Sequence, residues 1–216
     1  MKSFKSSFPD TLLFFDWEWK NRRSACLNLL QGKFGQEERI PARKTQIVSI
    51  SSEDARTFLE KNHLQGFGFG ALYLGLVHKD DLVGISVWKN NEGVVELNRL
   101  AFKGSVQGGF GKMLSYFIRQ ELPSGMPVLS YVDPRYANGH SYGNFDFSYE
   151  GDTGNPLYYY ANGTGIYHRR LFQKKEMKKR FGSFFDEKET ERENAKVFGY
   201  FRVYGLPQKK FIFKGV

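Results

Sequence analysis

Apolar and polar residues recur with two different periods along the chain, which predicts a mixture of strands and helices. After residue 50, the run Ser51-Ser52-Glu53-Asp54 supplies the capping oxygens and first-turn acids of a helix. A later helix places four apolar residues on one face. The elements predicted up to residue 133 are strand 45–50, helix 51–62, strands 72–77, 82–88 and 94–102, helix 110–121 and strand 127–133.

The predicted elements beyond residue 133 are shorter. Asn138-Gly139 predicts a turn, followed by one helical turn and a strand from Phe145 onward. The remaining elements are strands 157–160 and 166–172, a basic helix at 174–180, and strands 201–204 and 211–213. The changes along the chain indicate three parts: a basic and aromatic N-terminal extension (1–45), a main domain (46–172) and a C-terminal appendage that packs on the core (173–216).

The composition is that of a globular protein, with 216 residues, 40% of them apolar and 17% aromatic. No run approaches the ~18 apolar residues of a transmembrane helix, and no signal peptide follows the first residues. We therefore expect a cytoplasmic protein without a membrane partner. Cys26 is the single cysteine, which excludes an intrachain disulfide and a Cys-only zinc site. The net charge of +9 favours nucleic acid as the partner, although a basic surface can also serve solubility alone.

A strand, a glycine-rich loop and a helix follow one another between residues 94 and 121. Glycines at a helix start let an anion approach the free N–H groups of the first turn, and the helix dipole attracts it. A pyrophosphate or a DNA phosphate would satisfy these groups. A tight turn also uses glycines here, and the loop is neither a Walker A motif nor a complete GxGxxG. The candidate cofactor-binding residues are Gln107, Gly108, Gly109, Gly111 and Lys112.

The order of the elements resembles the GNAT acyltransferase fold: a strand hairpin, a long strand, a glycine loop, a helix, a strand, a short helix and a strand. The resemblance implies an α/β (α+β) fold with a mixed, mostly antiparallel sheet flanked by helices. It also implies acyl-coenzyme A or a related acyl donor at the glycine loop. The run 142–147 keeps the family's Tyr142 and its final Phe147. Asp146 and Val106 depart from the residues that the family prefers.

Further segments resemble phage GNAT-like proteins of two groups. One group is the Mom-type DNA modification proteins, which alter adenine, and the other is the domain fused behind the nuclease of Hef-like homing endonucleases. The matching segments are 58–66, 96–99, 129–135, 138–139 and Tyr142, and for the second group also 14–19, 41–44, 189–194 and 199–200. Segment 14–19 resembles the last strand of the fused nuclease, without the catalytic body before it. The resemblance implies a DNA partner in the cytoplasm of a bacterial host and no cleavage by this chain alone.

Three side chains are candidates for catalysis. His63 follows a helix and titrates near neutrality, so it could act as a general base or a metal ligand, or simply cap the helix. Asp133 ends a strand, where α/β proteins place their chemistry, and could orient a base or a metal. Alternatively, Asp133 locks the turn before Pro134 through Arg135. Tyr142 could donate a proton to a leaving thiolate, or it could pack.

Cationic side chains predict the contacts with nucleic acid. Asn98 and Arg99 face opposite sides of their strand, and we expect Arg99 to bind phosphate while Asn98 lines the cleft. In the stretch 168–180, seven Lys or Arg residues oppose only Glu176, and nearby tyrosines could stack on bases. A solvated helix face is the alternative. The residues expected to bind nucleic acid are Arg99, Arg135, Arg169, Arg170, Lys174, Lys175 and Lys178.

Two classes of function follow from these observations. In the first, a phage-type enzyme extrudes a base from DNA and transfers an acyl-like group to its exocyclic amine. In the second, the chain is a non-catalytic DNA-binding module related to the C-terminal part of homing endonucleases. His63, Asp133, Tyr142 and the glycine loop favour the enzyme, which we place first. The missing nuclease body and the departures in the loop favour the module. Metal use and oligomeric state stay open.

Overall fold

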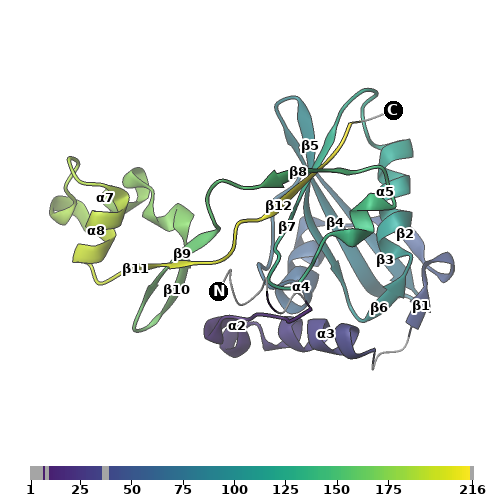
Figure 1. Cartoon of the computed structure of the whole chain (residues 1–216), viewed down its shortest axis with the longest axis horizontal. Helices are drawn as coiled ribbons and strands as arrows, with labels where there is room; N and C mark the ends of the chain where they lie inside the picture. Colours follow the sequence, from purple (N-terminus) through teal and green to yellow (C-terminus); the bar gives the residue numbers. More distant parts are fainter. Residues whose placement is uncertain (1–6, 8–9, 36–38, 215–216) are drawn as a thin grey trace. The chain divides into compact units, whose positions relative to one another are not determined.

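The computed structural model describes residues 7, 10–35 and 39–214 (Figure 1). The chain divides into two compact units. The sheet unit consists of Thr11–Asp152 and Lys209–Val216, and the other unit of Met1–Asp10 and Thr153–Gln208. We call Thr153–Gln208 the inserted unit, because the chain leaves the sheet unit at Asp152 and returns to it at Lys209. Within the described residues, no helix is both long and apolar enough to cross a membrane.

The sheet unit is built on a seven-stranded sheet. Neighbouring strands are antiparallel except for β5 and β7, which run parallel. The strands, in their order across the sheet, are β2 (Gln46–Ser49), β3 (Leu72–His78), β4 (Asp81–Asn91), β5 (Val94–Phe102), β7 (Val128–Val132), β12 (Lys209–Phe213) and β8 (Ser148–Asp152). This mixed, mostly antiparallel sheet with flanking helices confirms the predicted α/β (α+β) fold class.

Strands β5 and β7 are adjacent only over a short stretch. Their parallel pairing joins Val95 to Val128 and ends where Leu97 meets Ser130, although both strands continue. The two strands are therefore paired near their starts and are no longer paired where they end, near Phe102 and Asp133.

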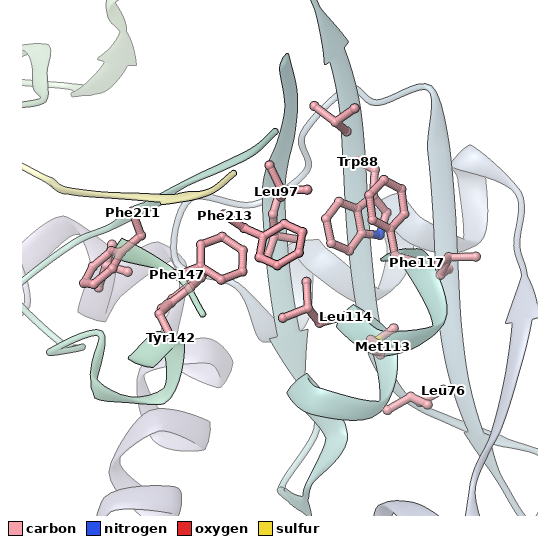
Figure 2. Close-up of a cluster of buried hydrophobic side chains, with 14 of the residues drawn as sticks. Leu76, Trp88, Leu97, Met113, Leu114, Phe117, Tyr142, Phe147, Phe211 and Phe213 are labelled. Atoms are coloured by element: carbon pink, nitrogen blue, oxygen red, sulfur yellow. The ribbon is translucent and has the colours of Figure 1, made fainter. Parts of the chain in front are cut away.

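Helices cover both faces of the sheet. On one face, α5 (Gly109–Gln120) packs Phe117 against Trp88 of β4, as Figure 2 shows. The two rings are stacked, with centroids 3.6 Å apart. On the other face, α4 (Ser52–Asn62) buries Phe58 and Leu59 against Ile85 and its neighbours. The Ser51 hydroxyl accepts a hydrogen bond from the Asp54 N–H at 3.0 Å, as the capping pattern of the sequence predicts.

The N-terminal part of the sheet unit is mostly helical. It contains α2 (Asp16–Asn21), α3 (Arg23–Phe34), β1 (Arg39–Pro41) and the 3₁₀ turn η1 (Ala42–Lys44), and β1 pairs in parallel with β6 (Ser105–Gln107). Segment 14–19 resembles a nuclease strand in sequence, yet here it enters a helix. The Glu18 carboxylate accepts the Phe15 N–H at 2.8 Å, and Asp16 adds a second acid to the first turn, which together favour the helix.

The inserted unit has its own sheet and its own aromatic core. Its antiparallel sheet has the order β10-β9-β11. The core joins Tyr160, Phe172, Met177, Ala195 and Tyr200. Its elements are β9 (Tyr158–Asn162), β10 (Gly165–His168), η2 (Arg169–Phe172), α7 (Lys174–Phe181), η3 (Gly182–Phe184), α8 (Glu191–Val197) and β11 (Phe201–Tyr204). The boundary predicted at residue 172 therefore falls inside this unit.

The ends of the inserted unit are hydrogen-bonded to each other. The Thr153 N–H donates to the Gln208 carbonyl at 2.8 Å, and the Gln208 N–H donates to the Thr153 hydroxyl at 2.9 Å. The adjoining residues Asp152 and Lys209 are partners in the pairing of β8 with β12. The inserted unit thus takes the place of the turn in a hairpin.

Candidate functional site

A buried network of charges lies at the end of β7. Arg135, 1% exposed, donates to both oxygens of Asp133 at 2.9–3.2 Å and to both oxygens of Glu18 at 2.8 and 3.0 Å. Burial alone would lower the pKa of Arg135, but the two carboxylates raise it overall. The Phe15 ring centroid lies 4.4 Å from the guanidinium carbon. The arginine is therefore permanently charged and fully enclosed.

This network replaces the phosphate contact predicted for Arg135. The N–H groups of Arg135 already donate to the carboxylates of Glu18 and Asp133, and the guanidinium is too deeply buried for a phosphate to reach it. Asp133 also accepts the backbone N–H of Arg135 at 3.0 Å. These contacts agree with the alternative that Asp133 stabilises the turn at Pro134 through Arg135. The third partner, Glu18, comes from α2 and joins the N-terminal segment to the sheet.

His63 is the residue that ends α4. Its Nδ1 accepts the Gln65 N–H at 3.1 Å, which leaves the proton of the neutral ring on Nε2. Burial, followed by the charges of Arg99 and Arg22, lowers the pKa of His63 to about 3. A ring whose lone pair is already bonded and whose proton affinity is so low does not suit a general base near neutral pH. The geometry instead favours the helix-capping alternative.

The low pKa of His63 makes the stability of the sheet unit depend on pH. The unfolded ring binds its proton near pH 6.5, whereas the folded ring stays neutral down to about pH 3. Above pH 6.5 the ring is neutral in both states and costs no stability. As the pH drops from 6.5 towards 3, only the unfolded state takes up the proton, so the free energy of unfolding falls. Between pH 7 and pH 5, we expect the free energy of unfolding of the wild type to fall by about 2 kcal/mol more than that of His63→Asn. Equal losses in urea titrations of the two proteins would contradict this.

Tyr142 lies in α6 (His140–Gly143) and is almost completely buried. Its hydroxyl is 2.7 Å from the Ser130 hydroxyl, and its ring packs against Phe110 and Phe211, with both centroid distances 4.9 Å. Figure 2 shows Tyr142 within the row of rings that continues through Phe147. Burial raises the pKa of Tyr142, and the Ser130 hydrogen bond opposes this only in part. The surroundings of Tyr142 are those of a packed core residue.

The glycine loop is closely packed against protein atoms. A Cβ on Gly109 would come within 2.7 Å of the Phe102 ring, and one on Gly111 within 2.4 Å of the Phe145 ring. Gly108 has a φ of +75°, which a side chain would strain, while Gln107 precedes it at the end of β6. Packing and backbone conformation thus account for the three glycines.

Lys112 has its charge directed to backbone carbonyls. Its Nζ donates to the Ala42 carbonyl at 2.9 Å and also to the Thr45 carbonyl. The lysine therefore fastens the segment after β1 to α5. The charge of Lys112 is therefore not free for a pyrophosphate, and the predicted acyl-coenzyme A site would depend on the backbone N–H groups of the loop alone.

Arg99 and Asn98 both donate hydrogen bonds to the loop before β3. Arg99 donates to the Gly66 carbonyl at 3.1 Å and to the Asn98 side chain at 2.8 Å. Asn98 in turn donates to the Phe69 carbonyl at 2.7 Å. A Cβ on Gly68 would lie 2.9 Å from Arg99, so the loop follows the arginine closely. This arrangement assigns both residues to holding the loop.

The basic stretch of the inserted unit separates into paired and unpaired cations. Lys178 forms an ion pair with Glu187, and Lys174 donates to the Glu187 carbonyl at 2.8 Å. Arg169, Arg170 and Lys175 are exposed, and none of them has an ion pair within the described part of the chain. Arg169 lies over the Tyr158 ring at 5.6 Å. Five of the residues predicted to bind nucleic acid thus lie in the inserted unit, and three of these five carry a charge that no ion pair compensates.

A pocket of about 170 Å³ in the inserted unit was not found from the sequence. It is lined by residues of α8, of β11 and of the turn between them: Arg192, Glu193, Lys196, Tyr200, Phe201, Arg202 and Tyr204. The alternation of cations and aromatics at 192–204 was the signal that could have indicated it. The structure thus adds a second basic and aromatic region to the one predicted at 158–180.

No metal centre emerges from the residues that the structure describes. Within them, no three His, Cys, Asp or Glu side chains come together as ligands. Burial, helped by the charge of Glu18, raises the pKa of the Cys26 thiol to about 11, so this cysteine stays protonated. Neither feature adds to the candidate sites above.

Comparisons with known proteins find a likeness in structure. No protein-family model matches the chain, and no curated protein matches it significantly in sequence. Among solved structures, the chain is similar to a Bacteroides thetaiotaomicron protein assigned to the GNAT family of acetyltransferases. The identity is 12%, the TM-score is 0.38, and the match covers 79% of this chain and 88% of that one.

Proposed function

We propose that this chain is a nucleic-acid-binding protein whose inserted unit makes the contacts, while the GNAT-like sheet unit is a non-catalytic scaffold. DNA is the partner that the resemblance to the domain of homing endonucleases leads us to expect. The observation that carries the proposal is the exposed, uncompensated charge of Arg169, Arg170 and Lys175, with Arg169 lying over the Tyr158 ring of β9.

The charge of the inserted unit supports this role. Thr153–Gln208 contains eleven Lys and Arg residues against six Asp and Glu, so it carries more than half of the net charge of +9. Cations that no carboxylate neutralises can replace the counterions of a phosphate backbone, which is the main source of affinity in such complexes. The partly exposed Tyr158 ring beside Arg169 adds a surface for a base to stack on.

The sheet unit offers less support for the alternative, an acyl transfer to a nucleobase amine. A proton donor at Tyr142 would need access to a reacting group, but its hydroxyl is bonded to Ser130 inside the core. The lysine of the glycine loop is bonded to carbonyls, and Asp133 is bonded to Arg135. We therefore place the binding module before the enzyme.

The salt dependence of DNA binding tests the proposal. The variant Arg169→Gln/Arg170→Gln/Lys175→Gln should weaken binding to a labelled duplex and reduce the slope of log affinity against log salt by up to about 3 units. Each residue that contacts a phosphate contributes about one unit of slope. Fluorescence anisotropy between 50 and 300 mM salt measures both quantities.

A matched variant controls for net charge. Lys174→Gln/Lys178→Gln/Lys179→Gln removes the same formal charge, but these ammonium groups already contact acidic residues or a carbonyl. We expect a clearly smaller change of slope. Equal slopes for the two variants would place the contacts elsewhere. A modified nucleoside in DNA from cells that express the protein, detected by mass spectrometry, would overturn the non-catalytic role.

A further inference from the structure

The pocket of the inserted unit lies along an edge strand. In the sheet order β10-β9-β11, strand β11 pairs with β9 on one side only, and α8 packs against it. Tyr204 and Phe201, at the two ends of β11, are 44% and 59% exposed, although both line the pocket. Two exposed aromatic side chains thus border the pocket.

Charged groups of the pocket are arranged on its helical side. Arg192 and Lys196 are four residues apart, so they share one face of α8, and both are exposed. Neither has an ion pair with any residue that the structure describes. Glu193, the one acid of the pocket, is bonded instead to Thr190, whose hydroxyl donates to it at 3.1 Å. The pocket therefore keeps an unneutralised positive charge.

Three side chains of the pocket, Tyr200, Arg202 and Tyr204, contact neighbouring groups of the inserted unit. Arg202 donates to the Tyr160 hydroxyl at 2.9 Å, and its guanidinium carbon lies 4.6 Å from the Tyr158 ring centroid. The Tyr204 ring lies 5.9 Å from Tyr158, and Tyr200 accepts a hydrogen bond from Arg180 at 2.6 Å. Side chains already fixed by such contacts lose little conformational entropy when a ligand binds.

We propose that this pocket takes one unstacked base of a single-stranded nucleic acid, with Tyr204 against the base and Arg192 and Lys196 on the adjoining phosphates. This inference rests on the proposed nucleic-acid-binding function and adds the kind of strand that is preferred. A cavity of about 150 Å³ holds a benzene ring, so about 170 Å³ admits a single aromatic ring of a base but no stacked pair. A base inside a duplex cannot enter without leaving its stack.

Binding measured with three ligands tests this inference. The ligands are a fluorescein-labelled 12-mer of thymidylates, a mixed-sequence duplex of the same length, and thymidine monophosphate as a competitor. We expect the wild type to prefer the single strand. Tyr204→Ala should lower affinity for the 12-mer by about tenfold and leave the duplex almost unchanged. Tyr204→Phe, which keeps the ring, should retain the affinity.

Control variants separate the pocket from the unit around it. Phe184→Ala removes an aromatic residue of the same unit that is 79% exposed and outside the pocket, and it should leave the affinity unchanged. Arg192→Gln should weaken binding of the 12-mer more than Lys188→Gln, which removes the same charge outside the pocket. Far-ultraviolet circular dichroism verifies that each variant is folded.

The possible outcomes distinguish this inference from the proposed function. Duplex binding without a preference for the single strand, or equal effects of Tyr204→Ala on both ligands, overturns the pocket assignment and leaves the proposed function intact. Absence of binding to either polymer overturns both. Competition by thymidine monophosphate as strong as that by the 12-mer would make the pocket a site for free nucleotides and overturn its role in strand binding.

Discussion

Replacing Arg135 with leucine is expected to lower the free energy of unfolding by about 3–5 kcal/mol, because the buried carboxylates of Glu18 and Asp133 would then have no cationic partner. The loss is a large part of the 5–15 kcal/mol that typically stabilises a domain. Urea titration followed by tryptophan fluorescence measures it. The same change should loosen residues 11–34, which limited proteolysis would detect as earlier cleavage there.

An exposed ion pair provides the control for this variant. Lys179 and Glu176 lie one turn apart on α7 with 3.6 Å between their charged atoms. Lys179→Leu should change the stability by less than about 1 kcal/mol, because water screens such pairs. A loss of comparable size in Arg135→Leu would mean that the buried network contributes little, and that another contact fastens the N-terminal segment.

Removal of the inserted unit should abolish nucleic-acid binding and leave the sheet unit folded. Asp152 and Lys209 are partners in the β8–β12 pairing, so an Asn-Gly turn can join the two strands in place of 153–208. We expect one cooperative unfolding transition and a loss of DNA affinity of at least about 100-fold, because most of the uncompensated charge is removed. Calorimetry and anisotropy measure the two effects.

Two opposite results would contradict this expectation. A shortened chain that binds DNA as well as the wild type would place the contacts on the sheet unit, and the proposed function would fail in its present form. A shortened chain that does not fold would show that the sheet unit depends on the inserted unit for more than a connection between β8 and β12.

Local patterns in the sequence were sufficient for most individual elements. Strand β5 was predicted with the observed bounds, and α4 was predicted from its Ser51 cap, because both depend on neighbours within a few residues. The short strand 211–213 was also found, yet nothing local indicates that it lies between β7 and β8. Strand partners far apart in sequence are set by tertiary packing, which a periodicity does not contain.

The candidate site was predicted less well, for a physical reason. Asp133 and Arg135 are close in sequence, and their mutual contact was an alternative from the outset. Their third partner, Glu18, is 117 positions from Arg135 in the chain, so the closure of the network was invisible in the sequence. Lys112 likewise meets a carbonyl 70 positions away. The sequence singled out these polar side chains, but it did not show their distant partners. Those long-range contacts decide whether a polar group is available for catalysis or stabilises the fold.

The insertion in the β8–β12 hairpin also has a consequence for synthesis on the ribosome. Strand β12 is synthesised after all the other strands of the sheet. Until residues 209–213 emerge, the edges of β7 and β8 that pair with β12 keep unpaired backbone groups. An unfolded inserted unit would hinder β12 from reaching these edges, since closing a longer loop costs more entropy. Once folded, its ends meet at Thr153 and Gln208 and it acts as a short turn. Early folding of the inserted unit would therefore shorten the time during which nascent chains can pair wrongly.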